Sequence, residues 1–121
     1  MATFSKQILS GSTDGKAVKV TGTGTAGAVT VHTGSSTATT LDEIWIYANN
    51  TSASDVKLTI EWGTATAADG NIEYTVKAEN GLYLIIPGLI LKGNATPLVV
   101  KAFAATADVI LLTGYVNRIT A

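Results

Sequence analysis

The sequence predicts an all-β protein, an antiparallel β-sandwich of about eight strands with a jelly-roll-like topology. Three observations predict this class. Apolar residues alternate with polar ones or stand in short blocks, and almost none follow the period of a helix. β-Branched and aromatic side chains fill these blocks. Turn-forming clusters separate them at intervals of roughly 8–14 residues, which is typical of sandwiches and barrels.

The chain starts with a segment that we expect to be an N-terminal arm, residues 1–15, ahead of a β-sandwich domain at residues 16–121. The run from Ser10 to Gly15 consists of small and polar residues that interrupt any regular element. We expect the arm to dock on a neighbouring subunit or on a partner. The alternative, in which the segment forms the first strand of its own sandwich, stays open. The apolar side chains of the arm are Phe4, Ile8 and Leu9.

Eight strands are expected along the remaining chain. Their residues are 16–21, 28–33, 41–49, 56–62, 71–78, 82–86, 98–104 and 109–119. A single short turn at residues 64–69 is the only helical structure that we expect. A chain of 121 residues is long enough for one hydrophobic core and too short for two, so these strands are expected to share one core.

The strand at residues 41–49 is apolar on both faces. Ile44, Ile46 and Ala48 point to one side, and Trp45 and Tyr47 point to the other. One of these faces must belong to the core. The other face then needs a second cover, either a neighbouring subunit or a bound ligand.

The next two strands alternate more simply and are expected to have one buried and one solvated face. Their polar faces carry Glu61 and Glu73, which we expect to lie in water beside lysine partners on neighbouring strands. An Asn80-Gly81 pair then predicts a tight turn. Residues 82–86 are continuously apolar, which predicts a strand covered on both faces.

Charged residues are scarce. They make up 14% of the chain, against about 25% in an average soluble domain. A small domain has much surface for its volume, so this deficit predicts that other chains cover part of the surface. We expect a homo-oligomer, most simply a trimer. The candidate interface residues are Phe4, Ile8, Leu9, Trp45, Tyr47 and Tyr83.

Composition also limits the chemistry. The chain has no cysteine and a single histidine, which excludes disulfides, thiolate metal sites and a His-rich metal site within one chain. The net charge of −1 gives no electrostatic basis for binding nucleic acid or an anionic membrane. No secretory signal and no apolar run of the ~20 residues that span a bilayer can be identified. We expect no cofactor and no metal.

Two features of the sequence could indicate a cofactor site or a catalytic site. Residues 22–27 match the glycine spacing of a dinucleotide-binding loop, but a strand pattern follows where that loop requires a helix N-terminus. His32 is the only imidazole that a nucleophile–histidine–carboxylate set could use, and nothing nearby supports such a set. We therefore expect a structural or exposed histidine and no catalysis.

Five blocks of the chain resemble small virion proteins of tailed bacteriophages. They are MATFSK at residues 1–6, LDEIWIYA at 41–48, LTIEWG at 58–63, LYLIIPG at 82–88 and GYVNRI at 114–119. The resemblance spans nearly the whole chain, although its blocks are structural. Some of these proteins decorate, or cement, the capsid shell as small β-rich subunits, frequently as trimers. The resemblance implies no catalytic residues.

The resemblance therefore implies a capsid decoration protein that binds the major capsid protein and stabilises the shell. Its place would be the virion, after synthesis in the host cytoplasm. The alternative is a tail or fibre component or a host-glycan-binding adhesin, because head, tail and fibre proteins share β-sandwich folds. Burial of Trp45 and Tyr47 between chains would favour the decoration protein. Their exposure in a concave groove would favour the adhesin.

Overall fold

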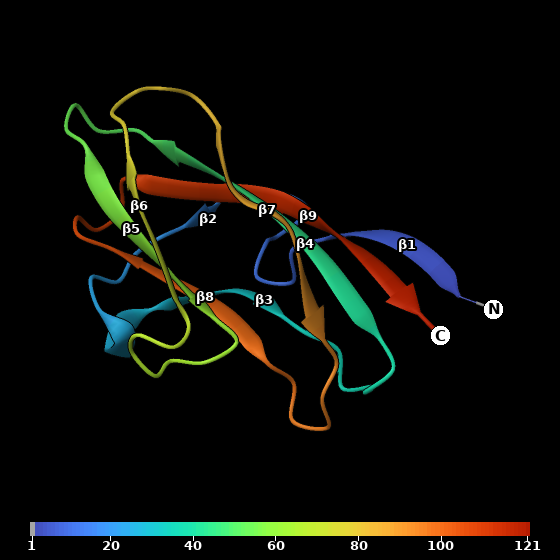
Figure 1. Ribbon diagram of the computed structural model, residues 1–121. Coiled ribbons are helices and arrows are strands. Elements are labelled where there is room, and N and C mark those ends of the chain that lie inside the picture. Colours follow the sequence, from blue (N-terminus) through green and yellow to red (C-terminus); the bar gives the residue numbers. More distant parts are fainter. Residues whose placement is uncertain (1) are drawn as a thin grey trace.

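The computed structural model describes residues 2–121 as two antiparallel sheets packed face to face (Figure 1). This arrangement confirms the predicted all-β sandwich. The strands are β1 (Thr3–Ile8), β2 (Val18–Lys19), β3 (Val29–Thr33), β4 (Leu41–Asn50), β5 (Val56–Trp62), β6 (Asn71–Val76), β7 (Tyr83–Lys92), β8 (Val99–Ala104) and β9 (Ile110–Thr120). The loop where a short turn was expected, residues 64–69, forms hydrogen-bonded turns at its end without a helix. A short 3₁₀ helix, η1 (Thr25–Gly27), lies instead in the glycine-rich stretch before β3.

The strand order is that of a jelly roll. The five-stranded sheet has the order β1-β9-β4-β7, with β2 also paired to β9, and the four-stranded sheet has the order β3-β8-β5-β6. Because β4 occupies one edge of β9 along its length, β1 and β2 share the other edge and act as two halves of one strand. If β1 and β2 are counted as one strand, the sandwich has eight strands. The first strand then pairs with the last, the second with the seventh, the third with the sixth and the fourth with the fifth, which is the pairing pattern of a jelly roll.

The core lies between the two sheets and is built mainly from alternate residues of the strands. In β4, Ile44, Ile46 and Ala48 are completely buried, as are Leu58 and Ile60 of β5 on the facing sheet. Each of the four larger side chains stabilises the fold by about 1.5–3 kcal/mol relative to its exposed state. The grouping of residues onto the two faces of each strand is therefore correct, and the structure assigns the Ile44 face of β4, left open by the sequence, to the core.

The prediction of an N-terminal arm is wrong for the residues that follow Ala2. Thr3–Ile8 form β1, which pairs with β9 from Thr3 opposite Thr120 to Ile8 opposite Tyr115, so the two chain ends lie side by side (Figure 1). Leu9 is buried in the core, with 1% of its surface exposed. The long edge of β9 offers backbone groups that need partners, and β1 supplies them. The segment thus belongs to the sandwich, which was the open alternative.

The prediction for residues 82–86 is also wrong. The strand is longer, Tyr83–Lys92, and lies at the edge of its sheet with β4 as its one neighbour. Within the predicted run, Leu82 and Tyr83 are exposed at 64% and 43% of their surface, whereas Ile86 is completely buried. Pro87 fits this edge because it has no N–H to leave unpaired. The continuous apolar run therefore belongs to an edge strand that packs on the core through Ile85 and Ile86.

Candidate functional site

The outer face of the five-stranded sheet is unusually apolar. Cross-strand register places on it the alternate residues of β1, β9, β4 and β7 that point away from the core. All of them are exposed or half-buried in the single chain. We call this surface the apolar face. Its large members are Phe4, Ile8, Leu41, Trp45, Tyr47, Leu84, Ile90, Leu111, Tyr115 and Ile119.

An aromatic platform occupies the middle of the apolar face. The rings of Trp45 and Tyr115, which lie opposite each other on β4 and β9, stack with centroids 6.1 Å apart and planes inclined by 14°. On the other side, the Trp45 ring lies against Gly88, where an added Cβ would come within 2.8 Å of the indole Cζ2. Gly88 has φ of +78°, which suits glycine and belongs to the irregular pairing of β7 with β4. The platform therefore depends on glycine at this position.

Hydrogen bonds hold the platform in one orientation. Trp45 Nε1 donates to Glu43 Oε1 at 2.7 Å, and Asn117 Nδ2 donates to the same oxygen at 2.8 Å. These two donors lower the pKa of Glu43 below its usual value. The indole nitrogen thus has a partner before any ligand arrives, so the apolar part of Trp45 is presented in a defined position.

The apolar face includes parts of two edge strands that are more exposed than its centre. Phe4 and Ile8 of β1 are 71% and 49% exposed, and Ile90 of β7 is 48% exposed. The face also carries four charged residues, Lys6, Lys19, Glu43 and Lys92. The Nζ of Lys6 lies 4.9 Å from the centroid of the Tyr115 ring. The strands β1 and β7 are the two opposite edges of one sheet.

The structure brings together four of the six predicted interface residues. Phe4, Ile8, Trp45 and Tyr47 share the apolar face. The other two do not belong to it, because Leu9 is in the core and Tyr83 stacks on Tyr74 of β6, with ring centroids 4.6 Å apart. Sequence reasoning missed Tyr115 and Ile90. Alternation along residues 109–119 would have marked Tyr115, but Ile90 lies beyond the strand that was expected.

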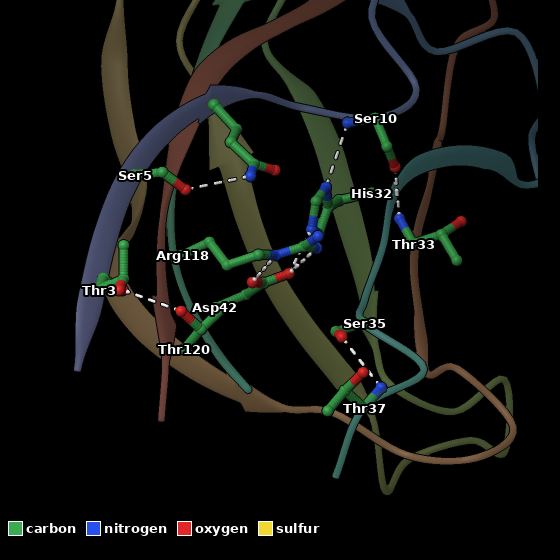
Figure 2. Close-up of polar contacts among 11 residues, drawn as sticks. Thr3, Ser5, Ser10, His32, Thr33, Ser35, Thr37, Asp42, Arg118 and Thr120 are labelled. Atoms are coloured by element: carbon green, nitrogen blue, oxygen red, sulfur yellow. Dashed lines mark hydrogen bonds and ion pairs between the residues drawn. The ribbon is translucent and has the colours of Figure 1, made fainter. Parts of the chain in front are cut away.

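A buried polar cluster ties the N-terminal segment to the sandwich (Figure 2). The carboxylate of Asp42, on β4, accepts hydrogen bonds from Arg118 Nε at 2.7 Å and Nη2 at 2.8 Å. His32 Nε2 lies 2.8 Å from Asp42 Oδ2, and the backbone N–H of Ser10 donates to His32 Nδ1 at 3.1 Å. Because Nδ1 accepts the bond from Ser10, it carries no proton, and Nε2 is therefore the nitrogen that donates to Asp42.

This cluster is an ion pair with a structural histidine. Burial alone would raise the pKa of Asp42, but hydrogen bonds from Arg118 and His32 outweigh it and hold the pKa below its usual value. The same pairing raises the pKa of Arg118. The Ser10 hydroxyl accepts from the backbone N–H of Thr33 at 2.6 Å and makes no bond to the imidazole, so the nucleophile-to-base contact of a catalytic triad is missing here.

A second site lies on the outer face of the four-stranded sheet. Glu61 was expected in water, but it is 2% exposed, and its Oε2 accepts a hydrogen bond at 2.9 Å from the hydroxyl of Thr25 in η1. The glycine-rich segment around η1 packs against β8 and shields this end of the sheet (Figure 1). Glu73, in contrast, is exposed and pairs with Lys57 at 3.2 Å, as expected of a solvated face.

Beside Glu61, a pocket of about 420 Å³ opens between the loop that follows β5 and the loop that precedes β8. Its lining includes Glu61, Lys101 and several hydroxyl and amide side chains.

Within residues 2–121, no three His, Asp, Glu or Cys side chains gather as a metal site would require. No helix in that range has the length and apolar character needed to cross a bilayer.

A scan against protein-family models and searches of the curated proteins and of the solved structures find no match to this chain.

Proposed function

We propose that this chain is a non-enzymatic structural protein of a tailed-bacteriophage virion, a decoration protein that binds the assembled capsid shell and stabilises it. The apolar face carries the proposal: a broad sheet surface with many apolar side chains and a fixed aromatic platform at its centre. The low charge of the chain and its resemblance to small phage virion proteins support the same role.

The apolar face suits a docking role because its anchor is already ordered. Aromatic side chains contribute most where they are rigid before binding, since little side-chain entropy is then lost on association. Trp45 is held by Tyr115, Glu43 and the backbone of Gly88. We propose that this platform rests on the major capsid protein. A ligand that binds only the closed lattice stabilises that lattice by mass action.

The edges of the same sheet supply the subunit contacts in this proposal. Phe4 and Ile8 lie at the β1 edge, and Leu89 and Ile90 lie at the β7 edge. A contact between the β1 edge of one subunit and the β7 edge of the next is heterologous, and such contacts close into a ring when the rotation between subunits allows it. A cyclic homotrimer is the assembly that we propose.

The first test is the number of copies of the protein in each virion, which indicates its position in the particle. Mass spectrometry of purified virions should give hundreds of copies for a shell protein, whereas a handful would indicate the tail and contradict the proposal. Particles made without the protein should lose their contents at a lower temperature.

Variants then test the surfaces. Tyr47→Asp, on the apolar face, should abolish binding to undecorated capsids, whereas Thr75→Asp, exposed on the opposite sheet, should not. Phe4→Asp should dissociate the trimer in analytical ultracentrifugation. Leu82→Asp removes an apolar residue of similar exposure, 64% against 71% for Phe4, outside the apolar face and should leave the trimer intact. A wild-type monomer of 12.4 kDa at high micromolar concentration would contradict the trimer.

The second candidate is a tail or fibre component or a host-glycan-binding adhesin. Trp45 and Tyr47 do not line the pocket, so they provide no concave aromatic groove for a glycan there. The observation that favours ligand binding is the separate pocket beside Glu61. Low copy number in the virion would favour this candidate.

A further inference from the structure

The loop that joins β6 of one sheet to β7 of the other contains the Asn80-Gly81 pair (Figure 1). Because the two strands belong to different sheets, this pair is not the centre of a β-hairpin. Positive φ occurs at Glu79 and Gly81, at 51° and 67°, and not at Asn80. Both residues of the pair are exposed and lie outside the paired parts of the strands. The pair therefore belongs to a solvated loop that no sheet ladder holds.

The two groups that could react with each other in this pair are unbound. Within residues 2–121, neither the side chain of Asn80 nor the backbone N–H of Gly81 makes a hydrogen bond. Gly81 has no Cβ, and an added one would meet nothing within 4 Å, so its nitrogen is sterically open. The fold thus leaves the Asn80 amide group and the next backbone nitrogen able to change their relative orientation.

The fold restrains the other asparagines of the described chain. Asn50 is completely buried, and its side-chain amide donates to two backbone carbonyl groups. Asn94 is exposed in the loop after β7, but it accepts a hydrogen bond from the Thr96 N–H at 3.3 Å and is followed by Ala95. The remaining three lie in strands: Asn49, Asn71 and Asn117. Among residues 2–121, Asn80 therefore combines exposure, an unbound side chain and a following glycine.

We propose that Asn80 is a site of spontaneous deamidation, with water as the co-reactant. Hydroxide removes the proton of the Gly81 N–H, and the nitrogen attacks Cγ of Asn80. An N–Cγ bond forms, the Cγ–Nδ2 bond breaks, and the amide nitrogen takes up a proton and leaves as ammonia. Water then opens the resulting five-membered imide. Opening at Cγ gives aspartate, and opening at the main-chain carbonyl gives isoaspartate, so the amide becomes a carboxylate in both products.

This modification changes the charge and the shape of the loop. Each conversion adds one negative charge to a chain whose net charge is −1. Isoaspartate also adds a carbon atom to the main chain between two anchored residues. On one side, the Glu79 N–H donates to the Asn50 carbonyl at 3.0 Å, and on the other side Tyr83 stacks on Tyr74. The inference goes beyond the proposed function, because this loop is not part of the apolar face.

The test is incubation of the folded wild-type protein at physiological temperature, at pH 7 and at pH 9. Samples taken over several weeks are analysed by anion-exchange chromatography and by tandem mass spectrometry of proteolytic peptides. A more acidic species should accumulate with first-order kinetics, and its modification should map to position 80 as both aspartate and isoaspartate. The rate should be higher at pH 9, because hydroxide removes the amide proton.

Variants test whether this pair is responsible. Gly81→Ala should slow the conversion by more than tenfold, because the added Cβ shields the nitrogen. Asn80→Gln should abolish it, because glutamine would have to form a larger and less favourable ring. Asn94→Gln is the matched control, since it changes the other exposed loop asparagine and should leave the rate unchanged.

Two outcomes would overturn the proposal. One is a wild-type chain that stays unmodified at position 80 after several weeks at pH 9. The other is conversion of Asn94 at the same rate as Asn80, because the fold would then not select the site. If Gly81→Ala fails to fold, the exposed substitution Asn80→Gln carries the test alone. Neither outcome bears on capsid binding through the apolar face.

Discussion

Arg118 and Asp42 form a two-bond ion pair that joins β9 to β4 at the end of the sandwich where the chain termini meet, with Nε–Oδ1 and Nη2–Oδ2 distances of 2.7 and 2.8 Å. Asp42 is almost completely buried, whereas Arg118 retains 24% side-chain exposure. A buried carboxylate of this kind makes stability depend on pH, and the sign follows from its lowered pKa.

Acid should remove the contribution of this ion pair. Because the pKa of Asp42 is lower in the folded protein than its ordinary value of 3.8, its contribution is fully present above about pH 4. This contribution is lost as the pH falls through the pKa that Asp42 has in the folded protein.

Asp42→Asn should reduce the free energy of unfolding at pH 7 by on the order of 3 kcal/mol, since it leaves Arg118 without its charged partner. The difference from wild type should shrink as the pH falls below about 4 in urea titrations. Asp69→Asn, at an exposed site, serves as the control, and a constant difference for Asp42→Asn down to pH 2 would contradict the prediction.

His32→Ala should destabilise the fold without affecting the apolar face. The change removes the acceptor of the Ser10 N–H and one donor to Asp42, so the free energy of unfolding should fall by about 1–3 kcal/mol. Oligomer size and capsid binding should be unchanged under conditions where the variant is folded. Because the two residues are in contact, the effects of His32→Ala and Asp42→Asn should not be additive in a double-mutant cycle. Additive effects, or loss of binding in a folded variant, would contradict the assignment.

Leu9 and Ile8 are adjacent in the chain but should respond very differently to truncation. Leu9→Ala should lower the free energy of unfolding by about 2–5 kcal/mol, because Leu9 is buried in the core. Ile8→Ala removes a half-exposed side chain and should cost well under half as much. Deletion of residues 1–10 removes β1 and Leu9 together and should lower the melting temperature or prevent folding. A truncated chain that melts like the parent would show that β1 is dispensable.

Gly88→Ala should displace the Trp45 ring. The new Cβ would come within 2.8 Å of the indole at a residue whose φ is +78°. Gly81→Ala is the matched control, because Gly81 also has positive φ, +67°, with nothing within 4 Å of a Cβ. Both variants should lose about 1 kcal/mol from backbone strain. Only Gly88→Ala should also alter the tryptophan fluorescence. Identical spectra for the two variants would show that Gly88 does not support the platform.

The sequence alone was sufficient for the fold class and for grouping the residues of the central strands onto two faces. Alternation with period two is a local property, so Ile44 and Ile46 could be assigned to one face of β4 before any partner was known. The scarcity of charge predicted surplus apolar surface, and the apolar face provides it. That another chain covers this face stays a prediction.

Tertiary structure alone decided which distant segments meet. Pairing of Thr3 with Thr120 turns an expected arm into a strand, although no local pattern near residue 3 records its partner. The burial of Glu61 depends on a hydroxyl 36 residues earlier in the chain, at Thr25. Local sequence determines backbone conformation and the alternation of faces. Burial and hydrogen bonding depend on strand order and register between remote segments, and these arise only when the whole chain packs into one core.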